Sequence, residues 1–151
     1  MEQEKKELLL RALRSYRHWI SRLEAAKLEL EELEYLTSVD YNKPNVQVTG
    51  TSSPTETLAR RLEELEWEVE QLPKVIKLIN CAFDALSVRQ RNVLERRFVL
   101  GYQPVEIMNE LDMDKKQYYR IYTSAIRDMC QVIGDVGFVI FDHFFKRKRA
   151  A

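Results

Sequence analysis

The sequence predicts an all-α protein in which a long N-terminal helical hairpin or coiled-coil arm precedes a C-terminal helix-turn-helix domain. The 151 residues include only 4 Gly and 4 Pro, and the charged 32% are mostly long-chain helix formers. Apolar side chains recur at steps of three and four over much of the first 86 residues. Because 45% of the residues are apolar, we expect a globular chain rather than a disordered one.

The first expected helix runs from residue 2 to about residue 36. It carries two apolar stripes, and two stripes indicate a helix that contacts more than one neighbour. Its beginning is basic and its end is acidic, and we interpret both charge runs as solvated helix surface. The stripes are Leu9, Leu13, Tyr16, Ile20 and Leu23, and then Leu8, Ala12, Trp19 and Ala26; the basic residues are Lys5, Lys6, Arg11, Arg14, Arg17 and Arg22.

Residues 38–53 form the only long connection, with Pro44, Gly50 and many short polar residues. A loop of this length in a small protein is often functional. The next helix has a clear start, because Ser53 can cap it, Pro54 suits the first helical position and Glu56 completes a capping box.

An apolar seam then continues through this second long helix at four-three spacing, which is typical of coiled-coil packing. Its partner is either the first helix folded back antiparallel or the same element of a second chain. The mixed apolar faces favour a dimer or higher oligomer. Pro73 predicts a kink or break near Leu72. The seam residues expected to make the contact are Leu58, Leu62, Leu65, Val69, Leu72, Ile76 and Ile79, and Phe83 and Leu86 continue the spacing.

Residues 87–133 have the pattern of a helix-turn-helix. Ser87 caps a supporting helix that Gly101 ends, and residues 104–111 form a short second helix. Asp112 occupies a turn position that needs a left-handed residue, and Asp114 can cap the third helix, residues 115–133. Expected buried residues are Val88, Val93, Leu94 and Phe98, then Ile107 and Leu111, with Met113 filling the angle between the helices.

The third helix of this segment has a buried face and an outward face. Tyr118, Ile121, Ala125 and Met129 repeat at three-four-four spacing, so we expect them in the core. The outward side chains are suited to DNA, because Lys and Arg pair with guanine or phosphate and Gln pairs with adenine. They are Lys115, Lys116, Gln117, Tyr119, Arg120 and Thr123, with Tyr122 at the boundary, and Arg89, Arg91, Arg96 and Arg97 of the supporting helix are expected to grip the backbone. The alternative is a helical bundle that binds no DNA.

Charge and cysteine content restrict the other classes of function. The net charge is zero, but residues 1–86 carry −4 and residues 87–151 carry +4, an asymmetry expected of a module with a nucleic-acid-binding end. Cys81 and Cys130 form no zinc-binding pattern, and His18 and His143 lie far apart. We therefore expect no metal, no cofactor and no enzyme. With no signal peptide and no membrane-spanning run, we expect a cytoplasmic protein.

Residues 134–151 form a separate C-terminal segment. Gly134 and Gly137 are expected to break the preceding helix, and an aromatic block, Phe138–Phe145, and a basic tail, Lys146–Arg149, follow. Such a block must be buried, and packing against the domain is favoured. A second subunit, another protein or an anionic membrane surface are the alternatives.

A set of residues in the helix-turn-helix segment carries a resemblance: Leu86-Ser87, Arg91, Leu94, Glu106-Ile107, Leu111, and a basic helix containing Ala125. At these residues the sequence resembles region 4 of bacterial sigma factors. With Val46-Gln47, the Ser53-Pro54 helix start and the long seam included, the sequence over about residues 39–133 resembles small phage late-gene regulators of the ArpU and RinA type. Nothing resembles sigma region 2, and Asp112 replaces the usual Gly of the turn, so neither a complete sigma factor nor a known target sequence is implied.

The resemblance implies a phage or prophage late-gene activator in a bacterial host cell, which binds double-stranded DNA at a promoter and contacts RNA polymerase. By position, its reading residues would be Lys115, Lys116, Gln117, Tyr119 and Arg120. Two alternatives of other classes stay open. One is a small-terminase-like DNA-packaging oligomer, and the other is a helical adaptor that binds only protein.

Overall fold

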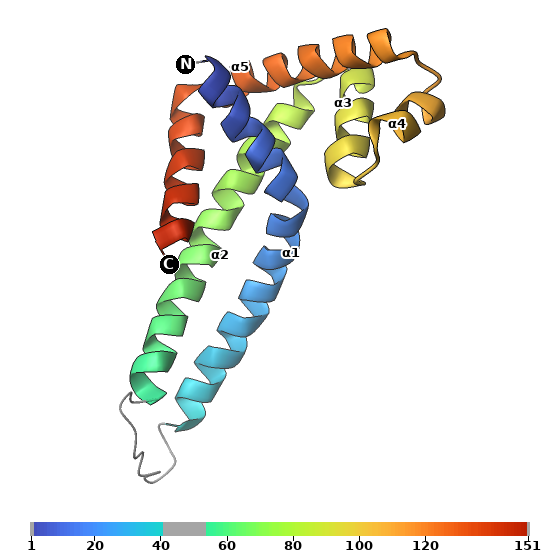
Figure 1. The fold of residues 1–151 in the computed structure, drawn as a ribbon. Coiled ribbons are helices and arrows are strands. Elements are labelled where there is room, and N and C mark those ends of the chain that lie inside the picture. Colours follow the sequence, from blue (N-terminus) through green and yellow to red (C-terminus); the bar gives the residue numbers. More distant parts are fainter. Residues whose placement is uncertain (1, 41–53, 151) are drawn as a thin grey trace. The chain divides into compact units, whose positions relative to one another are not determined.

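The computed structural model describes residues 2–40 and 54–150, and every regular element within them is a helix, which confirms the all-α prediction (Figure 1). Helix α1 extends to Asp40, so residues 38–40 are helical, not part of a loop as expected. Residues 41–53, including the expected cap Ser53, lie outside the described residues. The elements are α1 (Glu2–Asp40), α2 (Pro54–Asp84), α3 (Val88–Leu94), the π-helical segment η1 (Glu95–Val99), α4 (Pro104–Glu110) and α5 (Lys115–Ala150).

The chain divides into two compact units at points that differ from the expected domain boundaries. One unit comprises Met1–Trp19 with Lys74–Ala151, and the other comprises Ile20–Pro73. In this division the beginning of α1 and the end of α2 belong with the C-terminal half, so it does not follow the expected boundary between residues 86 and 87. Within the described residues, no helix is both long and apolar enough to span a bilayer.

In the unit Ile20–Pro73, α1 and α2 pair as an antiparallel hairpin. Arg22 Nε lies 2.5 Å from Glu68 Oε2, and Arg61 Nη2 lies 2.6 Å from Glu29 Oε2. Residue numbers rise along α1 as they fall along α2, so the pairing runs antiparallel within one chain. Helix α2 continues through Pro73 without the break that was one expected outcome.

The hairpin changes the interpretation of the apolar seam. Leu65, Leu72 and Ile79 are buried within the single chain, so these three cannot contact a second subunit as predicted. Their burial is accounted for by the intramolecular alternative. The other predicted contact positions are half-buried: Leu58, Leu62, Val69 and Ile76.

The core of the other unit is an aromatic cluster that joins the C-terminal segment to α1. The Trp19 ring centroid lies 6.5 Å from that of Phe141 and 5.2 Å from that of Phe144. Phe138 and Phe145 are buried in the same cluster. The expected packing of the aromatic block against its own domain is therefore confirmed.

A single residue allows α5 to bend back toward α1. Gly134 has φ 69° and ψ 174°, which is not a helical conformation, and the helix resumes directly after it. Figure 1 shows the orange and red stretches of α5 meeting at this sharp bend. The expected break over residues 134–137 is thus confined to Gly134. Gly137 is a buried helical residue, where a Cβ would lie 2.6 Å from Ile133 Cγ2.

Replacing Ser87 by Ala is expected to lower the free energy of unfolding by about 0.5–2 kcal/mol. Ser87 Oγ accepts a hydrogen bond from the Gln90 N–H at 3.2 Å, and Gln90 Oε1 accepts one from the Ser87 N–H at 3.0 Å. The substitution leaves the Gln90 N–H without this acceptor. Urea unfolding followed by circular dichroism measures the change. Val88→Ala is the control, because this neighbouring side chain is 79% exposed.

Candidate nucleic-acid interface

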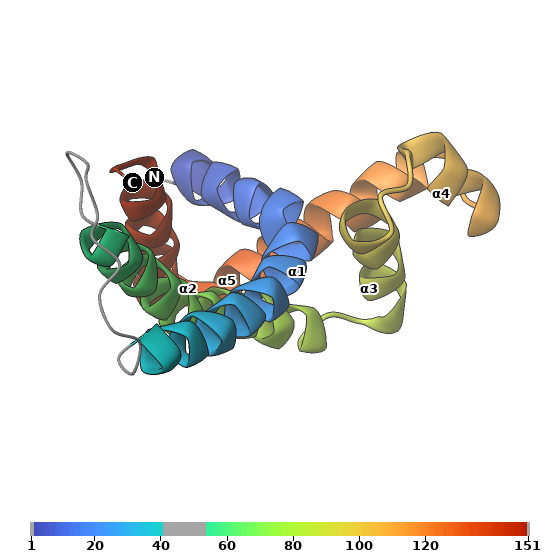
Figure 2. The ribbon, with the colours of Figure 1, turned by 90° about the horizontal axis from the view of Figure 1, so that it is seen from below.

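The scaffold of the candidate interface is the packing of α3 on the first stretch of α5. Val93 and Leu94 of α3 are fully buried. Gln90 Nε2 donates hydrogen bonds to Ser124 Oγ at 3.0 Å and to Asp128 Oδ2 at 2.9 Å, both on α5. In Figures 1 and 2, α3 and α4 both lie beside the orange stretch of α5.

Gln90 is a positioning residue that the sequence reasoning missed. Its side chain closes the cap of α3 and also ties α3 to α5. The Ser-x-x-Gln spacing of a capping box was the available signal. The two bonds to α5 could not be read from the sequence, because they depend on how the two helices cross.

Two details of the supporting helix differ from expectation. Val88 is exposed, not buried, because at about 100° per residue it lies opposite the face that carries Val93 and Leu94. The helix also widens into the π-helical segment η1, in which Phe98 is half-buried. The Phe98 ring stacks against Tyr122 with the centroids 6.3 Å apart. Burial raises the pKa of the Tyr122 hydroxyl above its ordinary value.

The turn between α4 and α5 has the expected geometry. Asp112 adopts a left-handed conformation with φ 51°. Asp114 caps α5, because its Oδ1 accepts a hydrogen bond from the Gln117 N–H at 2.7 Å. Ile107 of α4 is fully buried, while Leu111 and Met113 are half-buried. The turn therefore fixes where the first residues of α5 begin.

The two faces of α5 separate as predicted. The predicted core residues Tyr118, Ile121, Ala125 and Met129 are all buried. Tyr119 is 45% exposed, and its ring meets Tyr118 edge-on. Of the other predicted outward residues, Lys115, Lys116, Arg120 and Thr123 are exposed, and Gln117 is half-buried.

In the part of the chain that the structure describes, no carboxylate pairs with the cations on this outward face. Within residues 2–40 and 54–150, Lys115, Lys116 and Arg120 make no ion pair or hydrogen bond through their side chains. Many other cations of the chain are paired, such as Arg22 and Arg61. Positive charge at the start of α5 is therefore available to an external anion.

The four arginines predicted to grip a DNA backbone differ in their partners. Arg91 is held by Glu95 at 2.6 Å and by Asp84 at 3.2 Å. Arg96 lies 3.2 Å from Glu110, and Arg97 donates to the Tyr102 carbonyl at 3.2 Å. Arg89 is exposed and, in the part of the chain that the structure describes, has no partner. Arg89 is thus the best placed of the four to contact a phosphate.

The comparisons with known proteins add nothing to this geometry, since no family model, curated protein or solved structure matches the chain. The chemistry of the site follows from its residues. A capped helix presents cationic, amide, hydroxyl and phenol groups on one face and is fixed by apolar packing on the other. Such a face can donate several hydrogen bonds to an anionic surface and can neutralise its charge.

Proposed function

We propose that this chain is a sequence-specific, double-stranded DNA-binding transcriptional regulator whose α5 enters the major groove with its first turns. The supporting observation is that Lys115, Lys116 and Arg120, which have no ion-pair partner among the described residues, lie on the exposed face of a helix whose opposite face is buried. Because the start of α5 follows a tight turn from α4, its first residues are the ones that meet base edges in helix-turn-helix proteins.

The side chains of this face match the groups that a major groove displays. Lys and Arg donate to guanine O6 and N7 or to phosphates, and an amide such as Gln117 pairs with adenine N6 and N7. The groove is about 12 Å wide, which admits one α-helix. Packing by α3 and the hydrogen bonds from Gln90 hold α5 in place, so little ordering of the helix is needed on binding.

The finer part of the proposal rests on the resemblance to phage late-gene regulators and to sigma region 4. On that basis, the protein activates phage or prophage late genes at a promoter and contacts RNA polymerase. Two copies would bind half-sites whose centres lie about 34–36 Å apart or a multiple of that distance.

Replacing Lys115, Lys116 and Arg120 together by Ala is expected to weaken binding to a selected duplex site strongly. Each lost phosphate contact lowers the salt slope by about one, and each lost base contact costs roughly 1–3 kcal/mol and relaxes the preference at one base pair. Fluorescence anisotropy titrations of labelled duplexes at several salt concentrations measure both effects.

The matched control removes the same charge elsewhere. Arg60, Lys74 and Lys77 of α2 are exposed and have no ion-pair partner among the described residues. Replacing these three by Ala is expected to leave the base preference and the salt slope near those of the parent. If the α5 variant binds the site as tightly as the parent does, the reading face is not on α5.

A further inference from the structure

Some basic side chains at the beginning of α1 contact a partner within the chain, and others do not. Lys5 forms an ion pair with Asp135, the Arg11 guanidinium lies 4.0 Å from the Phe145 ring centroid, and Arg22 pairs with Glu68. Within residues 2–40 and 54–150, the remaining three have no ion-pair or hydrogen-bond partner: Lys6, Arg14 and Arg17. The uniform solvated surface expected from the sequence is therefore wrong for half of this run.

The three basic residues without a partner among the described residues share one side of α1. At about 100° per residue, Lys6, Arg14 and Arg17 fall within an arc of roughly 80°. Arg14 and Arg17 are exposed, and Lys6 is half-buried. Lys5 and Arg11 fall outside this arc, by roughly 100° and 60°. These three side chains without a partner, Lys6, Arg14 and Arg17, therefore form a cationic face on α1 that makes no ion pair or hydrogen bond within the described residues.

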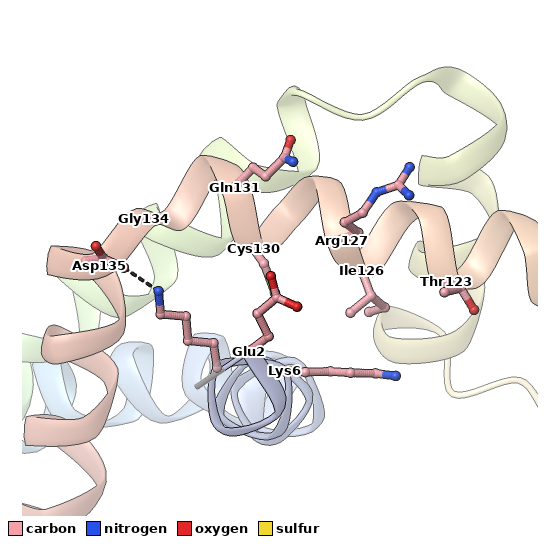
Figure 3. A pocket seen from close by; sticks show the side chains of 10 residues that line it. Glu2, Lys6, Thr123, Ile126, Arg127, Cys130, Gln131, Gly134 and Asp135 are labelled. Atoms are coloured by element: carbon pink, nitrogen blue, oxygen red, sulfur yellow. Dashed lines mark hydrogen bonds and ion pairs between the residues drawn. The ribbon is translucent and has the colours of Figure 1, made fainter.

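This face adjoins a groove between the first turns of α1 and the first stretch of α5 (Figure 3). The groove has a volume of about 510 Å³, and Lys6 lines it from α1 while Thr123 and Arg127 line it from α5. Figure 3 shows Lys6 extending beneath the stretch of α5 that carries Ile126 and Thr123. Two carboxylates also line the groove. Asp135 forms an ion pair with Lys5, and the negative charge of Glu2 partly offsets the positive charge of the cations.

The reading face of α5 continues into the same groove. Lys116, Arg120, Thr123 and Arg127 lie within an arc of roughly 60° along α5. Arg127 is exposed and lies 3.9 Å from Asp128, so its charge is only weakly compensated. From Lys116 to Arg127 the helix rises about 16 Å, which exceeds the roughly 12 Å width of a major groove. When the start of α5 lies in the major groove, Arg127 extends beyond the groove edge toward a flanking sugar-phosphate strand, and Lys6 lines the same protein groove as Arg127.

We propose that Lys6, Arg14 and Arg17 of α1 bind the phosphate backbone of the same DNA duplex whose major groove the start of α5 enters. This inference rests on the proposed function. Backbone contacts carry no sequence information themselves, but they fix the register and orientation of a protein on the duplex. α1 thus supplies affinity and orientation, and α5 supplies the base preference.

Replacing Lys6, Arg14 and Arg17 together by Gln in the full-length chain tests the proposal. Loss of three phosphate contacts is expected to lower the salt slope by about three and the affinity by roughly 10–100-fold at about 150 mM salt. The ranking of duplexes with single base-pair changes is expected to stay that of the parent. The control replaces Arg60, Lys74 and Lys77 by Gln, which removes the same charge and leaves the slope near the parent value.

The outcomes separate the two proposals. If the α1 variant keeps the parent's salt slope while the α5 variant loses affinity, the α1 contact is absent and the proposed function stands. If the parent itself does not retain duplex DNA, both proposals fail. An altered base ranking in the α1 variant would contradict a contact made only to phosphates. An unchanged thermal unfolding midpoint verifies that the variant is folded, as expected for cations that have no ion-pair partner among the described residues.

Discussion

Replacing Phe141 by Ala is expected to lower the free energy of unfolding by about 3–5 kcal/mol. The side chain is fully buried, and its ring lies 6.5 Å from Trp19 and 6.1 Å from Phe138 between centroids. Truncation to Ala removes the ring from an apolar site and leaves a cavity that rigid aromatic neighbours cannot fill completely. Urea unfolding followed by circular dichroism measures the loss.

The control for this prediction is Val139→Ala, because Val139 lies two residues away in the same helical stretch and is 55% exposed. Its effect is expected to stay within about 0.5 kcal/mol. Phe141→Leu is expected to recover part of the stability, since Leu fills part of the cavity. A loss below about 1 kcal/mol for Phe141→Ala would mean that the aromatic block is not packed on α1.

Replacing Gly134 by Ala is expected to lower the free energy of unfolding by about 1–3 kcal/mol. A φ of 69° with a ψ of 174° is a conformation that essentially only Gly adopts. A Cβ at this position would have no atom within 4 Å, so the cost comes from the backbone and not from crowding. Urea unfolding followed by circular dichroism measures the change.

Val136→Ala is the matched control for the bend, because this side chain is 75% exposed and close to Gly134 in sequence. It is expected to leave the unfolding midpoint nearly unchanged. If Gly134→Ala also left the unfolding midpoint unchanged, the bend would not depend on the glycine.

These two sites connect the fold to the proposed DNA-binding face. The bend at Gly134 returns the end of α5 to α1, where Phe141, Phe144 and Phe145 enclose Trp19. The first stretch of α5 is therefore supported by α3 and α4 near its beginning and by the aromatic cluster beyond its end. A helix supported on both sides can present its outward residues in one orientation.

Local features of the fold were predictable because they depend on neighbouring residues in the chain. Ser87 and Asp114 cap their helices, and Asp112 takes the left-handed turn position, as the sequence predicted. The buried face of α5 could be predicted from the three-four-four spacing of its apolar residues, because this helix has a single apolar stripe. Gly134 was expected to break the helix, and its dihedral angles explain why.

Features that depend on long-range packing were not predictable. The seam of α2 has the same spacing whether it faces α1 or a second chain, so the burial of Leu65, Leu72 and Ile79 within one chain could not be inferred. The division of the α1 cations depends on Asp135 and Phe145, which are more than 100 residues away along the chain.

Selection from a pool of random duplex DNA tests the central claim most directly. The full-length protein is incubated with the pool, bound fragments are sequenced, and the mass of the complex is measured. The proposal predicts enrichment of a shared motif about one or two helical turns long, bound by two copies of the chain, and loss of that enrichment in the Lys115, Lys116 and Arg120 variant. Recovery of fragments without a shared motif, or the same enrichment by the variant, would contradict it.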